Sequence, residues 1–153
     1  MVCFMYINSV NSVSVSFYKR AQILIGDIWG CFEGKGLGTF TDIDSITMFA
    51  DYRIPQALVY FGALEYSEEL LHRLEADDML KSGERQEIEI RGCTIWAVER
   101  ICKEIEERIK ENTGPQVFQV NPILVDHFLW DYRRDHNDKM KDVPFHKTRC
   151  IYY

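Results

Sequence analysis

A carboxylate in apolar surroundings is the first candidate for chemistry in this sequence. Asp51 follows Phe49 and Ala50 and comes shortly before Pro55, a residue typical of the first turn of a helix. A desolvated carboxylate beside an aromatic ring can stabilise an oxocarbenium-like centre while the ring stacks a base. A structural interpretation is also open, because Asp51 can cap the helix or pair with Arg53. On pattern alone, the structural interpretation is the favoured one.

A second group of polar side chains falls on the helix expected after Pro122. His127 and Asp131 stack one turn apart beside the apolar stripe, and Asp126 and Trp130 stack likewise on a neighbouring sector. Carboxylates among aromatic residues would suit a pocket for a polar, cationic ligand. The alternative is a surface helix with i,i+4 polar pairs. Asp126 and Asp131 are about 140° apart on a regular helix, so one ligand reaches both only by wrapping its edge or where the helix ends or distorts.

Two other motifs are interpreted as structural. Gly34, Gly36 and Gly38 lack the spacing of a phosphate-binding loop and follow a helix, so they indicate a loop between helices. The histidines show no H-x-x-x-H or H-E-x-x-H spacing, and neither a metal nor an organic cofactor is expected. These histidines are His72, His127, His136 and His146.

The elements that must position these residues are predicted to be mostly α, with little or no β. Apolar residues at steps of three and four predict helices over residues 17–32, 45–51, 55–64, 68–74 and 93–111 and from 122 onward. Residues 87–91 alternate and are interpreted as an extended link, and the tail from 144 to 153 is expected to dock. Residues 1–16 carry no charge and have a β-like bias without an obvious partner strand.

The apolar stripes of two helices are expected to face the core. In the first helix the stripe consists of Ala21, Leu24, Ile25, Ile28, Trp29 and Phe32. In the last helix it consists of Leu124, Val125, Phe128, Leu129 and Tyr132.

Composition limits the class of protein. The chain has 153 residues, enough for one domain with a core of its own, and 18 basic against 24 acidic residues give a net charge of −6. An acidic chain lacks the basic surface of a duplex-binding protein, and no apolar run is long enough for a membrane span. Five scattered cysteines, with no basic leader, predict buried free thiols and a cytoplasmic location.

Five segments together resemble the queuosine salvage protein family. They are FYKRAQILIGDIW, DIDSITMFADYRIPQ, SGERQEIEIRGCTIW, LVDHFLWDYRRDH and PFHKTRCIYY. The resemblance covers residues 17–153 and leaves 1–16 as an unmatched segment. It implies a mostly α fold similar to helix-hairpin-helix DNA glycosylases. It also implies hydrolysis of the N-glycosidic bond of queuosine 5'-phosphate, with release of queuine for return to transfer RNA.

The same resemblance implies roles for particular residues. The F-A-D motif of the family is matched by Phe49, Ala50 and Asp51, which makes Asp51 the catalytic carboxylate and Phe49 a wall of the base pocket. The D-[YH]-x-L-W-D motif implies substrate contacts at Asp126, His127 and Asp131. The phosphate site stays open between two basic groups, Lys19 with Arg20 and His146 with Lys147 and Arg149.

Family members are longer, with an N-terminal half that supplies part of the substrate pocket. We therefore expect apolar surface to be exposed where that half would dock, and self-association through this surface. Two further hypotheses stay open: a truncated, non-catalytic form that binds the base or acts as an interaction module, and a glycosylase on intact nucleic acid. The net negative charge of the chain argues against a glycosylase on intact nucleic acid. The expected partner is therefore a small molecule, with no direct nucleic-acid or membrane partner.

Overall fold

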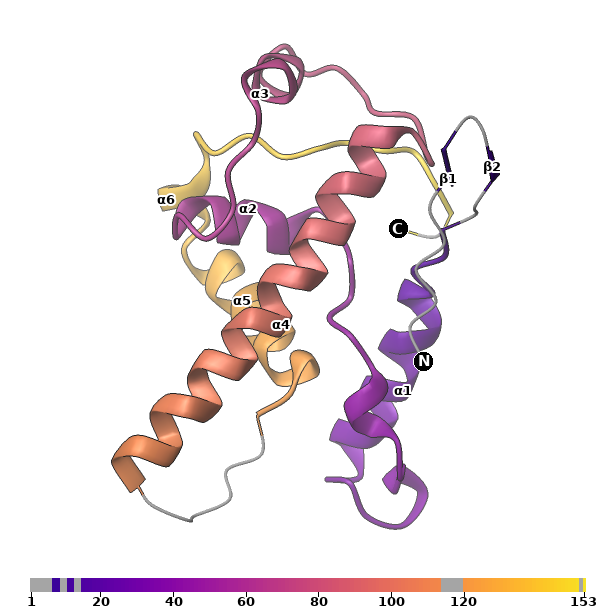
Figure 1. Ribbon diagram of the computed structural model, residues 1–153, viewed down its shortest axis with the longest axis vertical. Helices are drawn as coiled ribbons and strands as arrows, with labels where there is room; N and C mark the ends of the chain where they lie inside the picture. Colours follow the sequence, from indigo (N-terminus) through magenta and orange to yellow (C-terminus); the bar gives the residue numbers. More distant parts are fainter. Residues whose placement is uncertain (1–6, 9–10, 13–14, 114–119, 152) are drawn as a thin grey trace.

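The computed structural model describes residues 7–8, 11–12, 15–113, 120–151 and 153. The described elements are β1 (Ile7–Asn8), β2 (Asn11–Ser12), α1 (Lys19–Cys31), η1 (Gly36–Gly38), η2 (Ile43–Ser45), α2 (Arg53–Tyr60), α3 (Glu68–Glu75), α4 (Arg85–Thr113), α5 (Pro122–Asp135) and α6 (Asn137–Met140) (Figure 1). In these residues the only strands are β1 and β2, two residues each and antiparallel. The mostly α prediction is confirmed, while the likeness to helix-hairpin-helix glycosylases stays a prediction.

The largest apolar core is formed by α2, α4 and α5. Its fully buried side chains include Met48, Ile54, Leu58, Ile95, Val98 and Met140. The predicted cap of α5 is present, because Asn121 Oδ1 accepts a hydrogen bond from the Leu124 N–H at 3.0 Å. Val125 and Leu129 face this core as expected, whereas Leu124 and Phe128 are exposed. The predicted inward face of α5 is therefore wrong at these two positions, and the buried Asp126 takes part of their place.

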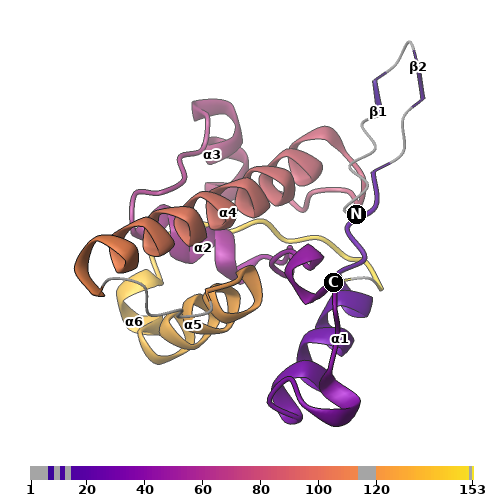
Figure 2. The ribbon, with the colours of Figure 1, turned by 60° about the horizontal axis from the view of Figure 1, so that its bottom comes forward.

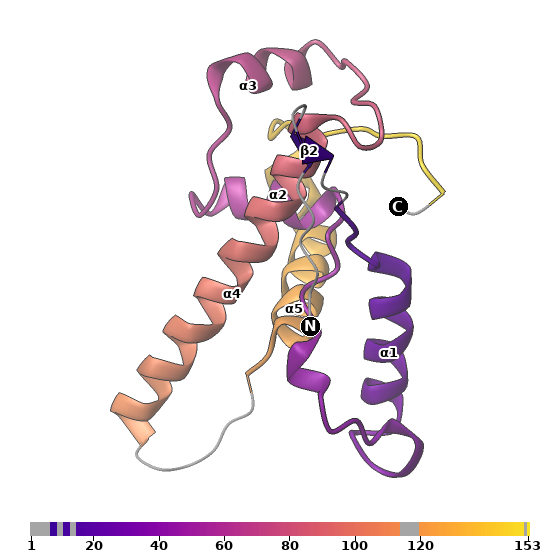
Figure 3. The ribbon, with the colours of Figure 1, turned by 45° about the vertical axis from the view of Figure 1, so that its right-hand side comes forward.

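Helix α1 stands apart from this core, on the far side of α5 from α4 (Figure 3). Figure 2 shows it projecting from the group formed by α2, α4 and α5. A separate apolar cluster joins α1 to the rest, with Phe49 and Ile123 buried against the half-buried Ile23 and Trp29. The cavity described below lies along this junction.

The buried face of α1 agrees with the predicted one only in part, because Ile25 and Trp29 pack against the cluster of Phe49 and Ile123 as expected. Gln22 and Gly26 are buried, whereas Ala21, Leu24 and Phe32 are exposed to solvent. Glycine and glutamine carry no hydrophobic signal, so a periodicity of apolar residues could not reveal that this face packs inward.

The predicted helix over residues 45–51 is wrong. The chain forms a single short turn, η2, and then runs extended to α2. Side chains from other elements bind its backbone: Gln22 Oε1 accepts from the Thr47 N–H at 2.9 Å, and Asp126 Oδ2 accepts from the Phe49 N–H at 2.8 Å. A helix would use these N–H groups internally, so the long-range contacts select the extended form.

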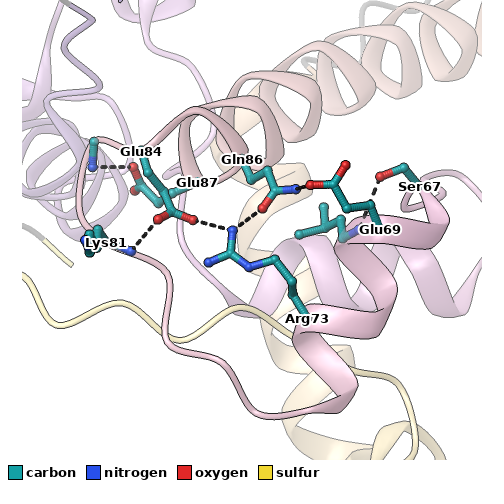
Figure 4. A network of polar contacts seen from close by, with 9 residues as sticks. Ser67, Glu69, Arg73, Lys81, Glu84, Gln86 and Glu87 are labelled. Carbon is teal, nitrogen blue, oxygen red and sulfur yellow. Dashed lines mark hydrogen bonds and ion pairs between the residues drawn. The ribbon is translucent and has the colours of Figure 1, made fainter.

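The extended link over residues 87–91 is also wrong, because these residues form the beginning of α4. Glu87 and Arg91 are four residues apart and form a buried ion pair, so both face the interior on one side of the helix. A network of hydrogen bonds holds this end of the helix (Figure 4). Arg73 donates to Glu84 and to Gln86, and Gln86 donates in turn to Glu69.

The tail docks as predicted and crosses the beginning of α4 (Figure 1). The Leu80 N–H donates to the Lys147 carbonyl at 2.9 Å, and His146 is only 1% exposed.

Four cysteines lie in the described residues, and all four are free thiols. Cys102 is buried and Cys150 half-buried, whereas Cys31 and Cys93 are exposed, so burial was predicted wrongly for the last two. Cys3 lies outside the described residues. None of the described helices combines the length and the apolar composition needed to cross a bilayer.

Candidate active site

A cavity of about 450 Å³ opens between α1, α5 and the extended segment before α2. It brings together all five residues singled out from the sequence, although they come from segments more than 70 positions apart. Its lining consists of Lys19, Ile23, Asp27, Phe49, Asp51, Asp126, His127, Trp130 and Asp131.

Asp51 is buried and held by the backbone of α2. Its Oδ1 accepts hydrogen bonds from the N–H groups of Arg53 at 2.9 Å and Ile54 at 3.0 Å. The carboxylate thus caps the helix, as the structural interpretation of the sequence expected, while it also lines the cavity. Its second oxygen, Oδ2, has no hydrogen-bond donor among the described residues. One oxygen fixes the orientation and the other is available to a ligand.

Asp126 and Phe49 are bound to each other across the cavity wall. Asp126 Oδ2 accepts from the Phe49 backbone N–H, and both residues are almost fully buried. The Phe49 ring lies 5.9 Å from the His127 ring, with the planes tilted by 53°. Phe49 fits because Gly26 of α1 has no side chain: a Cβ there would lie 2.7 Å from Phe49 Cζ.

Burial raises the pKa of both carboxyl groups in the cavity. Burial raises the pKa of Asp51, although the N–H groups of Ile54 and Arg53 and the charge of Lys19 act in the opposite direction. Burial also raises the pKa of Asp126 to about 8, with a further contribution from the charge of Asp51. A cationic ligand in the cavity would favour ionisation of both groups.

Asp131 and His127 are exposed, whereas Asp126 is buried. Asp131 forms an exposed ion pair with Arg134 at 3.0 Å, three residues along the helix rather than the four of the alternative interpretation. Yet both carboxylates border the same cavity on a regular α5, Asp126 inside it and Asp131 at the solvent side. A ligand that extends from the interior to the mouth would meet both, which answers the difficulty of their 140° separation.

The face of α1 contributes residues that sequence reasoning did not assign to the base site. Lys19, Ile23 and Asp27 follow one another at intervals of four, so they share one face of α1 and line the cavity. The spacing of four is visible in the sequence. The inward face of this helix was predicted from its apolar residues, however, and these three residues were therefore not grouped together.

Two groups of basic residues were candidates for binding the phosphate, and of their members only Lys19 lines this cavity. Arg20 donates to the Ile151 carbonyl at 2.9 Å. His146 is buried beside Tyr153, and Lys147 is paired with Asp77. Within the described residues, no group of three or more His, Cys, Asp and Glu side chains is placed to hold a metal ion.

The sequence was compared with known families and proteins. The family whose sequence model matches residues 1–153 is described as queuosine salvage protein. The chain belongs to the queuosine salvage protein family. Similar members include the queuosine 5'-phosphate N-glycosylase/hydrolase of Bos taurus, 58% identical over 139 residues, and that of Mus musculus, 57% identical over 139 residues. A protein of the same name from Sphaerobacter thermophilus is 38% identical over 139 residues.

These matches cover much of this chain but less of the other family members. The aligned part is 91% of this chain in all three cases, and 41%, 41% and 40% of the three relatives in the order given. The chain therefore spans about two fifths of the length of the curated queuosine salvage proteins it matches.

Proposed function

We propose that the cavity of Asp51 and Asp126 binds queuosine 5'-phosphate and hydrolyses its N-glycosidic bond. The observation that carries this proposal is the carboxylate of Asp51, which lines the cavity and is fixed through Oδ1, while Oδ2 has no donor among the described residues. Membership of the queuosine salvage protein family and the printed names of its relatives support the choice of substrate.

In the proposed reaction the bond between ribose C1′ and the base nitrogen breaks, and its electron pair leaves with the base. Positive charge then develops on the ribose, and Asp51 Oδ2 stabilises it more strongly in the transition state than in the ground state. The oxygen of a water molecule bonds to C1′, and one proton of that water ends on the base. The products are queuine and ribose 5-phosphate.

The remaining residues hold the substrate. Phe49 and His127 border the base, while Asp126 and Asp131 accept hydrogen bonds from its donor edge and its secondary ammonium group. We assign the phosphate contact to Lys19, because of the basic residues considered for it only Lys19 lines this cavity.

The test is release of queuine from queuosine 5'-phosphate by the purified chain, followed by chromatography. We expect Asp51→Asn to keep the fold and to reduce the rate at least about a hundredfold, because it removes the charge that stabilises the transition state. Asp44→Asn is the matched control, since Asp44 is exposed and outside the cavity lining, and its rate should equal that of the wild type. Near-normal turnover by Asp51→Asn would refute the assignment.

The non-catalytic hypothesis has its own observation, because the chain spans only two fifths of its relatives. Calorimetry with queuine distinguishes it from the enzyme. Tight 1:1 binding without any hydrolysis of queuosine 5'-phosphate would favour a base-binding module.

We also propose that the outer face of α1, defined as Ala21, Leu24 and Phe32, mediates self-association with a second copy of the chain. Leu24 is 59% and Phe32 43% exposed, so a single copy leaves this apolar face in water.

A further inference from the structure

The loop that carries Asp51 is held from behind by Arg91 of α4. Arg91 Nε donates a hydrogen bond to the carbonyl oxygen of Ala50 at 3.1 Å, and Ala50 lies between Phe49 and Asp51 in the chain. Arg91 does not line the cavity of Asp51, so its contact with the site runs through the backbone alone. Because it is only 7% exposed, its position depends on what surrounds it.

Glu87 and two aromatic rings fix the guanidinium of Arg91. Nη1 donates to Glu87 Oε1 at 2.9 Å, with Glu87 only 1% exposed. The guanidinium carbon lies 4.1 Å from the centre of the Phe17 ring and 4.7 Å from that of the Tyr153 ring. A buried ion pair of this kind is stable only if further hydrogen bonds satisfy its remaining polar atoms.

The tail provides one of those hydrogen bonds. The Tyr153 hydroxyl donates to Glu87 Oε1 at 2.8 Å, and the Gly83 N–H donates to Oε2 at 3.0 Å. Glu87 thereby accepts hydrogen bonds from the tail, from Arg91 and from the turn that precedes α4. Figure 4 shows the contacts that hold this turn.

His146 fixes the Tyr153 hydroxyl in turn. Its Nε2 lies 2.7 Å from the Tyr153 oxygen, and the single hydroxyl proton already points to Glu87, so Nε2–H must be the donor. Burial lowers the pKa of His146 to about 4, which leaves the ring neutral and consistent with this tautomer at neutral pH. The contacts thus run without a break from the tail to the Ala50 carbonyl.

We propose that Tyr153, Glu87 and Arg91, here called the tail-to-loop network, position the carboxylate of Asp51 for the reaction, with Tyr153 as a positioning residue that does not touch the substrate. The role rests on the proposed function, because it concerns the rate at that site. Loss of the Tyr153 hydroxyl leaves Glu87 short of one donor and His146 Nε2–H without its acceptor. Glu87 and Arg91 then shift, and the Ala50 carbonyl and Asp51 shift with them.

The test compares two variants that each lose one phenolic hydroxyl. Tyr153→Phe keeps the ring on Arg91 and removes the two hydrogen bonds of the hydroxyl. Tyr66→Phe is the matched control: its hydroxyl is buried without a partner among the described residues, and it packs on Leu70, Leu74, Leu80 and Ile90, away from the cavity. Both variants should stay folded, as checked by circular dichroism.

For Tyr153→Phe we expect kcat for queuine release to fall about tenfold, because small displacements of a catalytic group are costly. KM should stay within about twofold of the wild type, because the displaced carboxylate acts mainly in the transition state. Tyr66→Phe should keep both constants. A wild-type kcat in Tyr153→Phe, or an equal loss in Tyr66→Phe, would overturn the proposal.

A second readout does not depend on activity. The carbon-13 chemical shift of the Ala50 carbonyl reports its hydrogen bond from Arg91, so it should change in Tyr153→Phe and stay constant in Tyr66→Phe. If the wild-type chain releases no queuine, the proposed function fails, and this shift alone decides whether the tail controls the loop. An unchanged shift in Tyr153→Phe would then refute the network.

Discussion

At the scale of single residues, the two interpretations of Asp51 turn out to be compatible. The sequence offers a cap at the beginning of α2 and a ligand-facing carboxylate as alternatives, yet Oδ1 accepts the two hydrogen bonds of the helix while the same residue lines the cavity. The helix cap supplies the rigidity that a stabiliser of positive charge needs, because the group does not have to reorganise when the charge develops.

Asp126 gives a prediction at the same scale that is independent of any reaction. Its pKa is raised by burial to about 8, against about 3.9 for an unfolded aspartate. Between these values the folded protein keeps a proton that the unfolded chain has lost, so this group lowers the free energy of unfolding as the pH rises. Asp126→Asn removes the effect, and its amide oxygen can still accept from the Phe49 N–H.

We therefore expect Asp126→Asn to be more stable than the wild type at pH 8, by a few kcal/mol, and similar to it near pH 4. Urea denaturation across this pH range measures the difference. Asp27→Asn is the control, since Asp27 lines the same cavity but is exposed, and its stability should follow the wild type. Parallel curves for Asp126→Asn and the wild type would contradict the prediction.

At the scale of elements, the sequence predicted helices well where apolar residues alone bury a face. The middle of α4 behaves in this way, with Ile95, Val98 and Cys102 buried as expected. Prediction failed where polar groups decide the structure. The beginning of α4 depends on the buried pair of Glu87 and Arg91, which periodicity of apolar residues cannot detect.

The candidate site shows the same division. Phe49, Asp51, Asp126, His127 and Asp131 were all identified from the sequence and share one cavity. The resemblance to a family singled them out as a set. The extended form of the loop with Phe49 and Asp51 was not predictable, because its N–H groups donate to side chains far away in the sequence, those of Gln22 and Asp126.

Helix α1 yields a prediction that compares two of its glycines. Gly26→Ala should destabilise the protein by about 1–3 kcal/mol and raise KM, because the new Cβ would displace the Phe49 ring from the cavity wall. Gly30→Ala, in the same helix, has open space at its Cβ and should stabilise it by about 0.5–1 kcal/mol. Urea denaturation and queuine-release kinetics measure both effects. Equal stability changes for the two variants would refute the packing role of Gly26.

At the scale of the whole molecule, α1 stands apart from the main apolar core and joins the rest through the cluster of Phe49 and Ile123. It projects from the group of α2, α4 and α5 (Figure 2). The residues that define its outer face are apolar and exposed. A helix in this position is the natural place for a further surface to pack. The cytoplasmic location expected from the free thiols stays a prediction.

We expect the self-association proposed for this face to appear as a molar mass that rises with protein concentration in light scattering. Leu24→Glu together with Phe32→Glu should shift the chain to a monomer, since a charge at the centre of an apolar interface is costly. Trp96→Glu is the control, because Trp96 is 67% exposed on α4, which lies on the other side of α5 from α1 (Figure 3). A monomer at all concentrations in the wild type would exclude the proposal.

The guanidinium of Arg91 is where the segment before α1 and the tail meet, between the rings of Phe17 and Tyr153. Ribosomes build the chain from the N-terminus, so the loop with Asp51 emerges long before Tyr153 does. Until that tyrosine arrives, Arg91 lacks one of its two rings and Glu87 one of its donors. The contacts that hold the loop of Asp51 through Arg91 are consequently complete only after Tyr153 has been synthesised, although the carboxylate itself is made much earlier.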